Sequence, residues 1–78
     1  MQVEIEIKSM WYLDEDDGKT LASAGRSRTG KEEDTVKEIV FNPVAGYVIA
    51  LLGGDMWIIP PHRVLSVQAY KPKVSTLQ

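Results

Sequence analysis

Residues 47 to 70 read YVIALLGGDMWIIPPHRVLSVQAY, and this stretch carries the strongest structural signal in the chain. Two apolar runs stand on either side of Gly53-Gly54-Asp55, a pattern typical of a tight β-hairpin. Pro60-Pro61 ends the second run, because proline has no N–H to donate to a strand ladder. A 3₁₀ turn is expected at residues 61 to 63, followed by a last strand over residues 64 to 70. The positions of this strand expected to face inward are Leu65, Val67 and Ala69.

The residues just before this stretch predict a second hairpin. Residues 36 to 42 read VKEIVFN, which is rich in strand-forming residues. Pro43 cannot continue a central strand and Gly46 supplies turn freedom, so a hairpin loop is expected over residues 42 to 46. Residues 47 to 52 are apolar at every position, which indicates a strand that is covered on both faces.

The N-terminal segment alternates between apolar and charged residues. Positions 3, 5 and 7 are apolar and positions 4, 6 and 8 are charged, which predicts a half-buried strand over residues 2 to 13. Continuing this alternation places Trp11 on the apolar side and Met10 and Tyr12 on the charged side. Tyr12 is therefore a candidate for contact with a ligand or partner at the surface.

The segment from residue 14 to residue 35 has no clear period. It begins with the acidic run Asp14-Glu15-Asp16-Asp17 and continues through residues 25 to 31, which read GRSRTGK. So many residues without periodicity are unusual as a connection in a small domain. We therefore expect one long loop here, either a functional loop or a mobile hairpin.

The expected order is a long strand, a long loop, three strands joined by tight hairpins, a 3₁₀ turn and a last strand. This order and spacing resemble the layout of SH3-type and Sm-type small barrels. The resemblance implies an all-β fold, a small five-stranded antiparallel barrel, and such folds host many unrelated functions. We expect one barrel domain over residues 1 to 70 and a loose tail over residues 71 to 78.

The composition limits how a chain of 78 residues can be stabilised. With no cysteine and a single histidine, disulfides are excluded and a structural zinc site is disfavoured. Self-association is then the remaining common way to stabilise a domain with so small a core. No signal peptide or membrane-spanning run is visible, so we expect a cytoplasmic protein without membrane contact, cofactor or metal.

The basic segment over residues 25 to 31 is the best candidate for an anion site. Arg26, Arg28 and Lys31 supply three cations in a seven-residue segment that also holds two glycines, and such a composition suits phosphate contacts. The segment is not a Walker A loop, because Glu32 stands where that motif requires Ser or Thr. The alternative interpretation is a solvated hairpin tip whose charges neutralise the neighbouring acidic residues.

Two further features are weaker candidates. The acidic run at residues 14 to 17 lacks the spacing of a calcium loop and is best interpreted as a solvated turn. His62 has no nucleophile beside it in the sequence, so a structural role in the turn is favoured over acid–base catalysis. Arg63 remains a candidate for contact with a ligand or a neighbouring subunit.

Three functions fit these observations. The leading hypothesis is a non-enzymatic binding module that self-associates and engages a protein or a small anionic ligand, because the strand over residues 47 to 52 is too apolar for a lone small domain. The first alternative is an oligomer that binds nucleic acid or sequesters a nucleotide, as some phage proteins do, through residues 25 to 31. The second alternative is a regulator that inhibits a host protein through residues 14 to 35.

Overall fold

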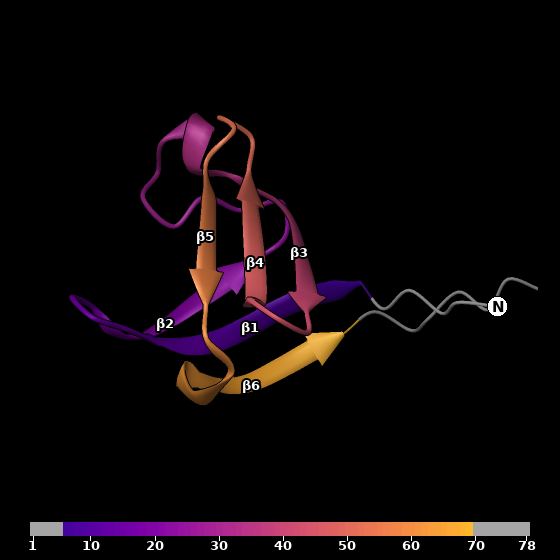
Figure 1. The fold of residues 1–78 in the computed structure, drawn as a ribbon. Coiled ribbons are helices and arrows are strands. Elements are labelled where there is room, and N and C mark those ends of the chain that lie inside the picture. The colour runs from indigo at the N-terminus through magenta and orange to yellow at the C-terminus, as the bar shows by residue number, and fades with distance from the viewer. Residues whose placement is uncertain (1–5, 70–78) are drawn as a thin grey trace, which may run out of the picture.

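The computed structural model describes residues 6 to 69, which fold into six antiparallel strands in two three-stranded sheets (Figure 1). The expected start of the first strand at residues 2 to 5 and the expected tail at residues 71 to 78 lie outside the described residues. The elements are β1 (Ile7–Asp14), β2 (Gly18–Ser23), the 3₁₀ helix η1 (Glu32–Asp34), β3 (Val36–Asn42), β4 (Gly46–Leu51), β5 (Met56–Ile59), the 3₁₀ helix η2 (Pro61–Arg63) and β6 (Val64–Ala69).

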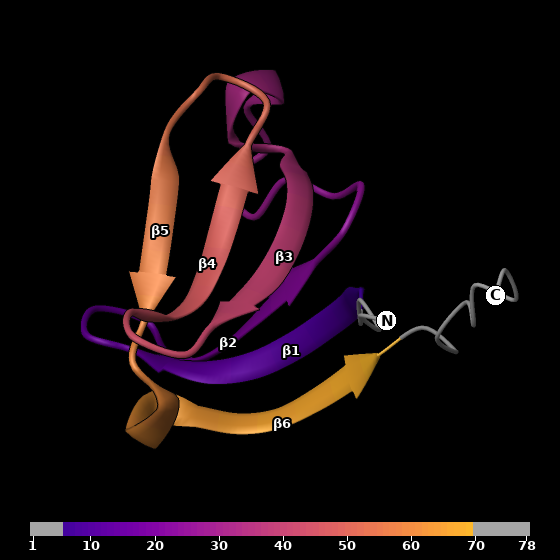
Figure 2. The same cartoon turned by 45° about the vertical axis from the view of Figure 1, so that its right-hand side comes forward.

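The first sheet has the strand order β2-β1-β6 and the second has the order β3-β4-β5. In both views the strands of the second sheet run across those of the first, with the core between the two layers (Figures 1 and 2). The all-β class, the antiparallel pairing, the tight hairpin at residues 53 to 55 and the 3₁₀ turn after Pro60 are confirmed. Within residues 6 to 69 the strand ladders do not close into a barrel.

The prediction of five strands with one long loop after the first is wrong, because residues 18 to 23 form β2. This strand pairs with β1 in register from Ser9 opposite Ser23 to Asp14 opposite Gly18. Its buried residues are Thr20 and Ala22, whereas the neighbouring apolar side chain of Leu21 is 39% exposed. The loop is therefore confined to residues 24 to 35, and part of that segment is the helix η1.

A backbone bridge joins the two sheets at the end of β2. The Gly25 amide donates to the Val36 carbonyl over 2.9 Å, and the Val36 amide donates to the Arg26 carbonyl over the same distance. One antiparallel bridge between Ser27 and Thr35 extends this contact. The segment after β2 is thus fixed against the first residues of β3.

The predicted alternation of β1 is reversed in its second half. The pairing of β1 with β6 shifts register between Ile7 and Ser9, the signature of a β-bulge. One extra residue turns every later side chain to the opposite face. Met10 and Tyr12 are consequently 1% exposed, and Trp11 is 38% exposed. The prediction that Tyr12 lies on the surface is therefore wrong.

The predictions for two other strands also need correction. In β3 a register shift between Val36 and Glu38 places Val36 and Ile39 together in the core, although strict alternation along residues 36 to 42 would place them on opposite faces. In β6 the expected inward residues are exposed, because this strand contacts mainly β1 in its own sheet and is not packed under the second sheet. The buried core consists of Ile7, Met10, Tyr12, Ala22, Val36, Ile39, Ile49, Leu51 and Ile59.

Among the described residues, no helix has the length and apolar character needed to cross a membrane.

Candidate functional site

The acidic run is the turn that joins β1 to β2. The Asp14 Oδ1 atom accepts hydrogen bonds from the amides of Asp16 at 2.8 Å and Asp17 at 3.2 Å. Aspartate favours such turns because its short carboxylate reaches the amides two and three residues later. Gly18 follows with a φ of +69°, a conformation that suits glycine. The acidic residues therefore have a structural explanation, as expected for a solvated turn.

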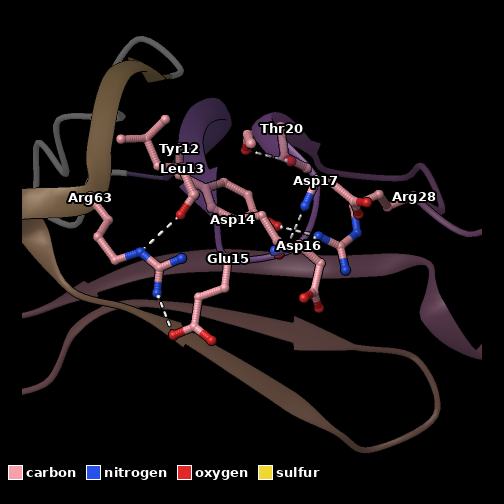
Figure 3. A network of polar contacts seen from close by, with 10 residues as sticks. Tyr12, Leu13, Asp14, Glu15, Asp16, Asp17, Thr20, Arg28 and Arg63 are labelled. Atoms are coloured by element: carbon pink, nitrogen blue, oxygen red, sulfur yellow. Dashed lines mark hydrogen bonds and ion pairs between the residues drawn. The ribbon is translucent and has the colours of Figure 1, made fainter.

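Arg28 is bound to Tyr12 and Asp14 at the end of β1 (Figure 3), and its contact with Trp57 connects this turn to the second sheet. Its Nη1 atom donates to Asp14 Oδ2 and to Tyr12 Oη, each over 2.9 Å. Its Cζ atom lies 4.6 Å from the centroid of the Trp57 ring, within the range of a cation–π contact. One guanidinium thus contacts β1, the acidic turn and β5 together.

These contacts determine the protonation states in the cluster. Burial raises the pKa of the Tyr12 hydroxyl, although the nearby Arg28 lowers it in part. Hydrogen bonds from the Asp16 amide, the Arg28 guanidinium and the Asp17 amide lower the pKa of Asp14 from 3.8 to about 2. At neutral pH Tyr12 is therefore a neutral hydroxyl, and Asp14 is a carboxylate facing a permanent cation.

The lowered pKa of Asp14 predicts a pH-dependent contribution to stability. A group whose pKa is lower in the folded chain stabilises the fold above its unfolded pKa, and this stabilisation is lost as the pH falls through the folded value. Asp14→Asn keeps the Oδ1 acceptor and removes the charge, so it should lower the free energy of unfolding at pH 7 by up to about 1 kcal/mol. Urea titrations should show this difference shrinking as the pH falls from about 4 to about 2.

Asp16→Asn is the control, since it removes the same charge from an exposed carboxylate that accepts no hydrogen bond among the described residues. A wild-type advantage over Asp14→Asn that is equal at all pH values would contradict the prediction.

Arg63 lies at the other end of the turn and is also engaged. Its Nε atom donates to the Leu13 carbonyl over 2.8 Å, and its Nη1 atom lies 3.4 Å from Glu15 Oε1 (Figure 3). The Glu15 side chain is 84% exposed, so this ion pair adds little stability. Arg63 thus ties η2 to the end of β1.

Arg26 and Lys31 are the two remaining cations of the basic segment. Both are exposed, and neither side chain has an ion-pair partner in the part of the chain that the structure describes. The backbone of Lys31 is used within the segment, where its carbonyl accepts a hydrogen bond from Ser27 Oγ over 2.7 Å. Arg26 follows Gly25, whose φ of +85° sets the turn after β2.

Two surface grooves lie beside the stack of Arg28 on Trp57, and both residues line each of them. The first groove, which we name the basic groove, has a volume of about 250 Å³. The second, the acidic groove, has a volume of about 360 Å³ and is lined by Asp14, Glu15 and Asp16 as well as by Arg63. The basic groove is lined by Leu21, Ala22, Ser23, Arg26, Ser27, Arg28, Val36 and Trp57.

The structure divides the sequence-predicted ligand residues among different places. It brings Arg26 and Arg28 together in the basic groove, places Arg63 in the acidic groove and leaves Lys31 outside both linings. Tyr12 lies beneath Arg28 as a hydrogen-bond acceptor and lines the acidic groove with little exposed surface. The assignment of these residues to a ligand stays a prediction.

Trp57 lines both grooves, although the sequence pattern does not mark it as a site residue. It alternates with Ile59 along β5, which is a signal for the inner face of the sheet. Its position beside Arg28 depends on how the two sheets are placed, and local sequence carries no signal for that contact.

The outer face of the second sheet carries an exposed apolar surface. Val40, Val48 and Ile58 pair across the three strands and form one row. The next row on the same face holds Ala50 and Met56 and begins on β3 with the exposed Glu38. Val40 is 40% exposed, Ile58 54% and Met56 63%. We name this surface the outer apolar face and define it as Val40, Val48, Ala50, Met56 and Ile58.

Within residues 6 to 69 no group of three or more His, Asp or Glu residues is arranged to hold a metal ion. Comparisons of the chain with protein-family models, with curated proteins and with solved structures found no match.

Proposed function

We propose that this protein is a non-enzymatic binding module that self-associates by packing the outer apolar faces of two copies together. The observation that carries the proposal is the unbroken apolar row of Val40, Val48 and Ile58 on a face exposed to solvent. The solvent face of an antiparallel sheet is usually polar, and an apolar patch on it favours an interface. The occupant that we propose is a second copy of this chain.

A second copy fits this surface because its central row is apolar and uncharged, with Glu38 at the margin of the next row. Two such sheets can pack about 10 Å apart, as the layers of a β-sandwich do. In a two-fold dimer each residue of the patch meets the same patch on the partner, so one surface suffices. The outer face of the first sheet is less suited, since Lys19 Nζ lies 5.0 Å from the centroid of the exposed Trp11 ring.

The non-enzymatic part of the proposal rests on the engaged side chains. Tyr12 and Asp14 are held by Arg28, and His62 lies exposed on η2. Among the described residues, His62 makes no hydrogen bond or ion pair, and this supports the proposal of a non-enzymatic role.

We also propose that the two sheets are the halves of a partly open SH3-like barrel. Support comes from the backbone bridge of Gly25 and Arg26 with Val36, which links the sheets at one corner. If this bridge is a stable part of a barrel wall, the amides of Gly25 and Val36 exchange slowly with deuterium, whereas rapid exchange at both would count against the barrel.

Sedimentation velocity over a range from micromolar to millimolar protein tests the self-association. We expect the wild type to form a concentration-dependent dimer. Ile58→Lys should weaken it about 100-fold or more, because each dimer would bury two unpaired ammonium groups. Val44→Lys is the matched control, since Val44 is 97% exposed in the turn between β3 and β4 and lies outside the outer apolar face. A wild type that stays monomeric at millimolar concentration would end the proposal.

A further inference from the structure

We propose that the basic groove binds a small aromatic anion. The anionic group contacts the guanidinium groups of Arg26 and Arg28, and the ring lies against the apolar side chains of the groove. This ligand site does not depend on self-association, since no residue of the outer apolar face lines the basic groove.

The charges around the groove favour an anion. Two guanidinium groups line it and no carboxylate does, whereas the acidic groove is lined by three carboxylates. Arg26 has no ion-pair partner among the described residues. Arg28 uses only Nη1 for its bonds to Tyr12 and Asp14, so its Nε and Nη2 donors have no partner within residues 6 to 69. Guanidinium donors of this kind suit carboxylate and phosphate oxygens.

The apolar residues that line the groove indicate that the rest of the ligand is an aromatic ring. Leu21, Val36 and the half-buried Trp57 give the groove apolar surface. A flat ring can contact such surface and the Arg28 guanidinium together, because guanidinium groups stack on aromatic rings. The volume of about 250 Å³ lies just below the range of about 300–1,000 Å³ typical of drug-sized ligands, so the ligand is small.

The groove is also largely organised before a ligand arrives. Asp14 and Tyr12 fix the Nη1 end of Arg28, and the Trp57 ring supports its plane. The backbone of Arg26 is fixed by its hydrogen bond from the Val36 amide. Binding therefore costs little ordering of Arg28, which favours affinity.

Nucleotides and aromatic carboxylates share this chemistry, and an NMR titration distinguishes them. The probes are adenosine monophosphate, indole-3-acetate, adenosine and inorganic phosphate, added to the ¹⁵N-labelled wild-type protein. We expect saturable shifts at the amides of residues 23 to 27, at Val36 and at the Trp57 indole N–H with one or both aromatic anions. The aromatic anion with the lower Kd shows whether the groove prefers a phosphate or a carboxylate. Adenosine and phosphate should bind far more weakly, because each supplies only half of the contacts.

Two matched variants test which cationic side chain of the segment contacts the anionic group of the ligand. Arg26→Gln should raise the Kd of the better anion about tenfold, the usual effect of losing one charge-assisted hydrogen bond. Lys31→Gln makes the same charge change in the same segment but outside the groove, so its Kd should stay within about twofold of the wild type. Both residues are exposed, and the dispersion of the NMR spectrum confirms that each variant is folded.

The absence of saturable shifts at these positions with either aromatic anion at millimolar concentration would overturn the inference. Equal weakening by Arg26→Gln and Lys31→Gln would also overturn it, because the segment would then attract anions without a defined site. Self-association is measured separately with the Ile58→Lys variant, so the failure of one proposal is distinguishable from the failure of the other.

Discussion

Replacing Tyr12 with alanine is expected to lower the free energy of unfolding by about 3–5 kcal/mol, the range for large aromatic side chains in a core. Tyr12 is 1% exposed and lies among the buried residues of both sheets. The substitution also removes the hydroxyl that accepts a hydrogen bond from Arg28. Small domains are only marginally stable, so this loss should consume most of the stability of the fold.

Leu13→Ala is the control for this prediction, because Leu13 is the next residue and its side chain is 44% exposed. Its carbonyl still accepts the hydrogen bond from Arg63 after the substitution. We expect a loss below about 1 kcal/mol, as is usual for partly exposed positions. Denaturant titrations of both variants decide between two registers of β1. If Leu13→Ala were the more damaging change, the bulge near the start of β1 would be refuted and the simple alternation of the sequence restored.

Gly46→Ala is the second change with a large expected effect. Gly46 has a φ of +108°, and a Cβ atom there would lie 2.6 Å from the Ile59 carbonyl oxygen and 3.1 Å from Pro61 Cδ. The backbone strain costs about 1–3 kcal/mol and the overlap with a fixed backbone atom about as much again. We expect a total loss of about 2–6 kcal/mol in the free energy of unfolding, measured by urea titration.

Gly54→Ala separates the two causes. Gly54 has a similar φ of +97°, but a Cβ atom there would meet no atom within 4 Å. Only the strain of about 1–3 kcal/mol should remain. Equal losses for Gly46→Ala and Gly54→Ala would show that the first residue of β4 is not pressed against the Pro60-Pro61 corner.

Strong local signals in the sequence predicted the second half of the fold well. The turn at residues 53 to 55 and the corner at Pro60-Pro61 follow from backbone chemistry that acts within a few residues, and both are confirmed. The strand β2 was missed because its inward residues, Thr20 and Ala22, are small or polar, while the more hydrophobic Leu21 faces outward. Here packing against the other sheet overrides the pattern of hydrophobicity.

The candidate site was predicted only in part, for a similar reason. The composition of the basic segment makes Arg26 and Arg28 candidates, since cations between glycines are visible in any sequence. The partners of Arg28 come from β1 and β5, which belong to different sheets, and only the folded chain brings Tyr12, Asp14 and Trp57 together around it. The bulge in β1 that turns Tyr12 inward likewise depends on pairing with β6, which local sequence does not reveal.

The pairing of β1 with β6 has a consequence for how the chain folds. The first described strand joins the last one, with Ile7 opposite Ala69, so the first sheet needs almost the whole chain. The hairpins of the second sheet are local and can form early, whereas the long loop between β1 and β6 must close before that contact yields any stability. During synthesis on the ribosome, β1 therefore has no pairing partner on its β6 side until β6 has been synthesised. Over that interval its unpaired edge is open to misassembly with other nascent chains.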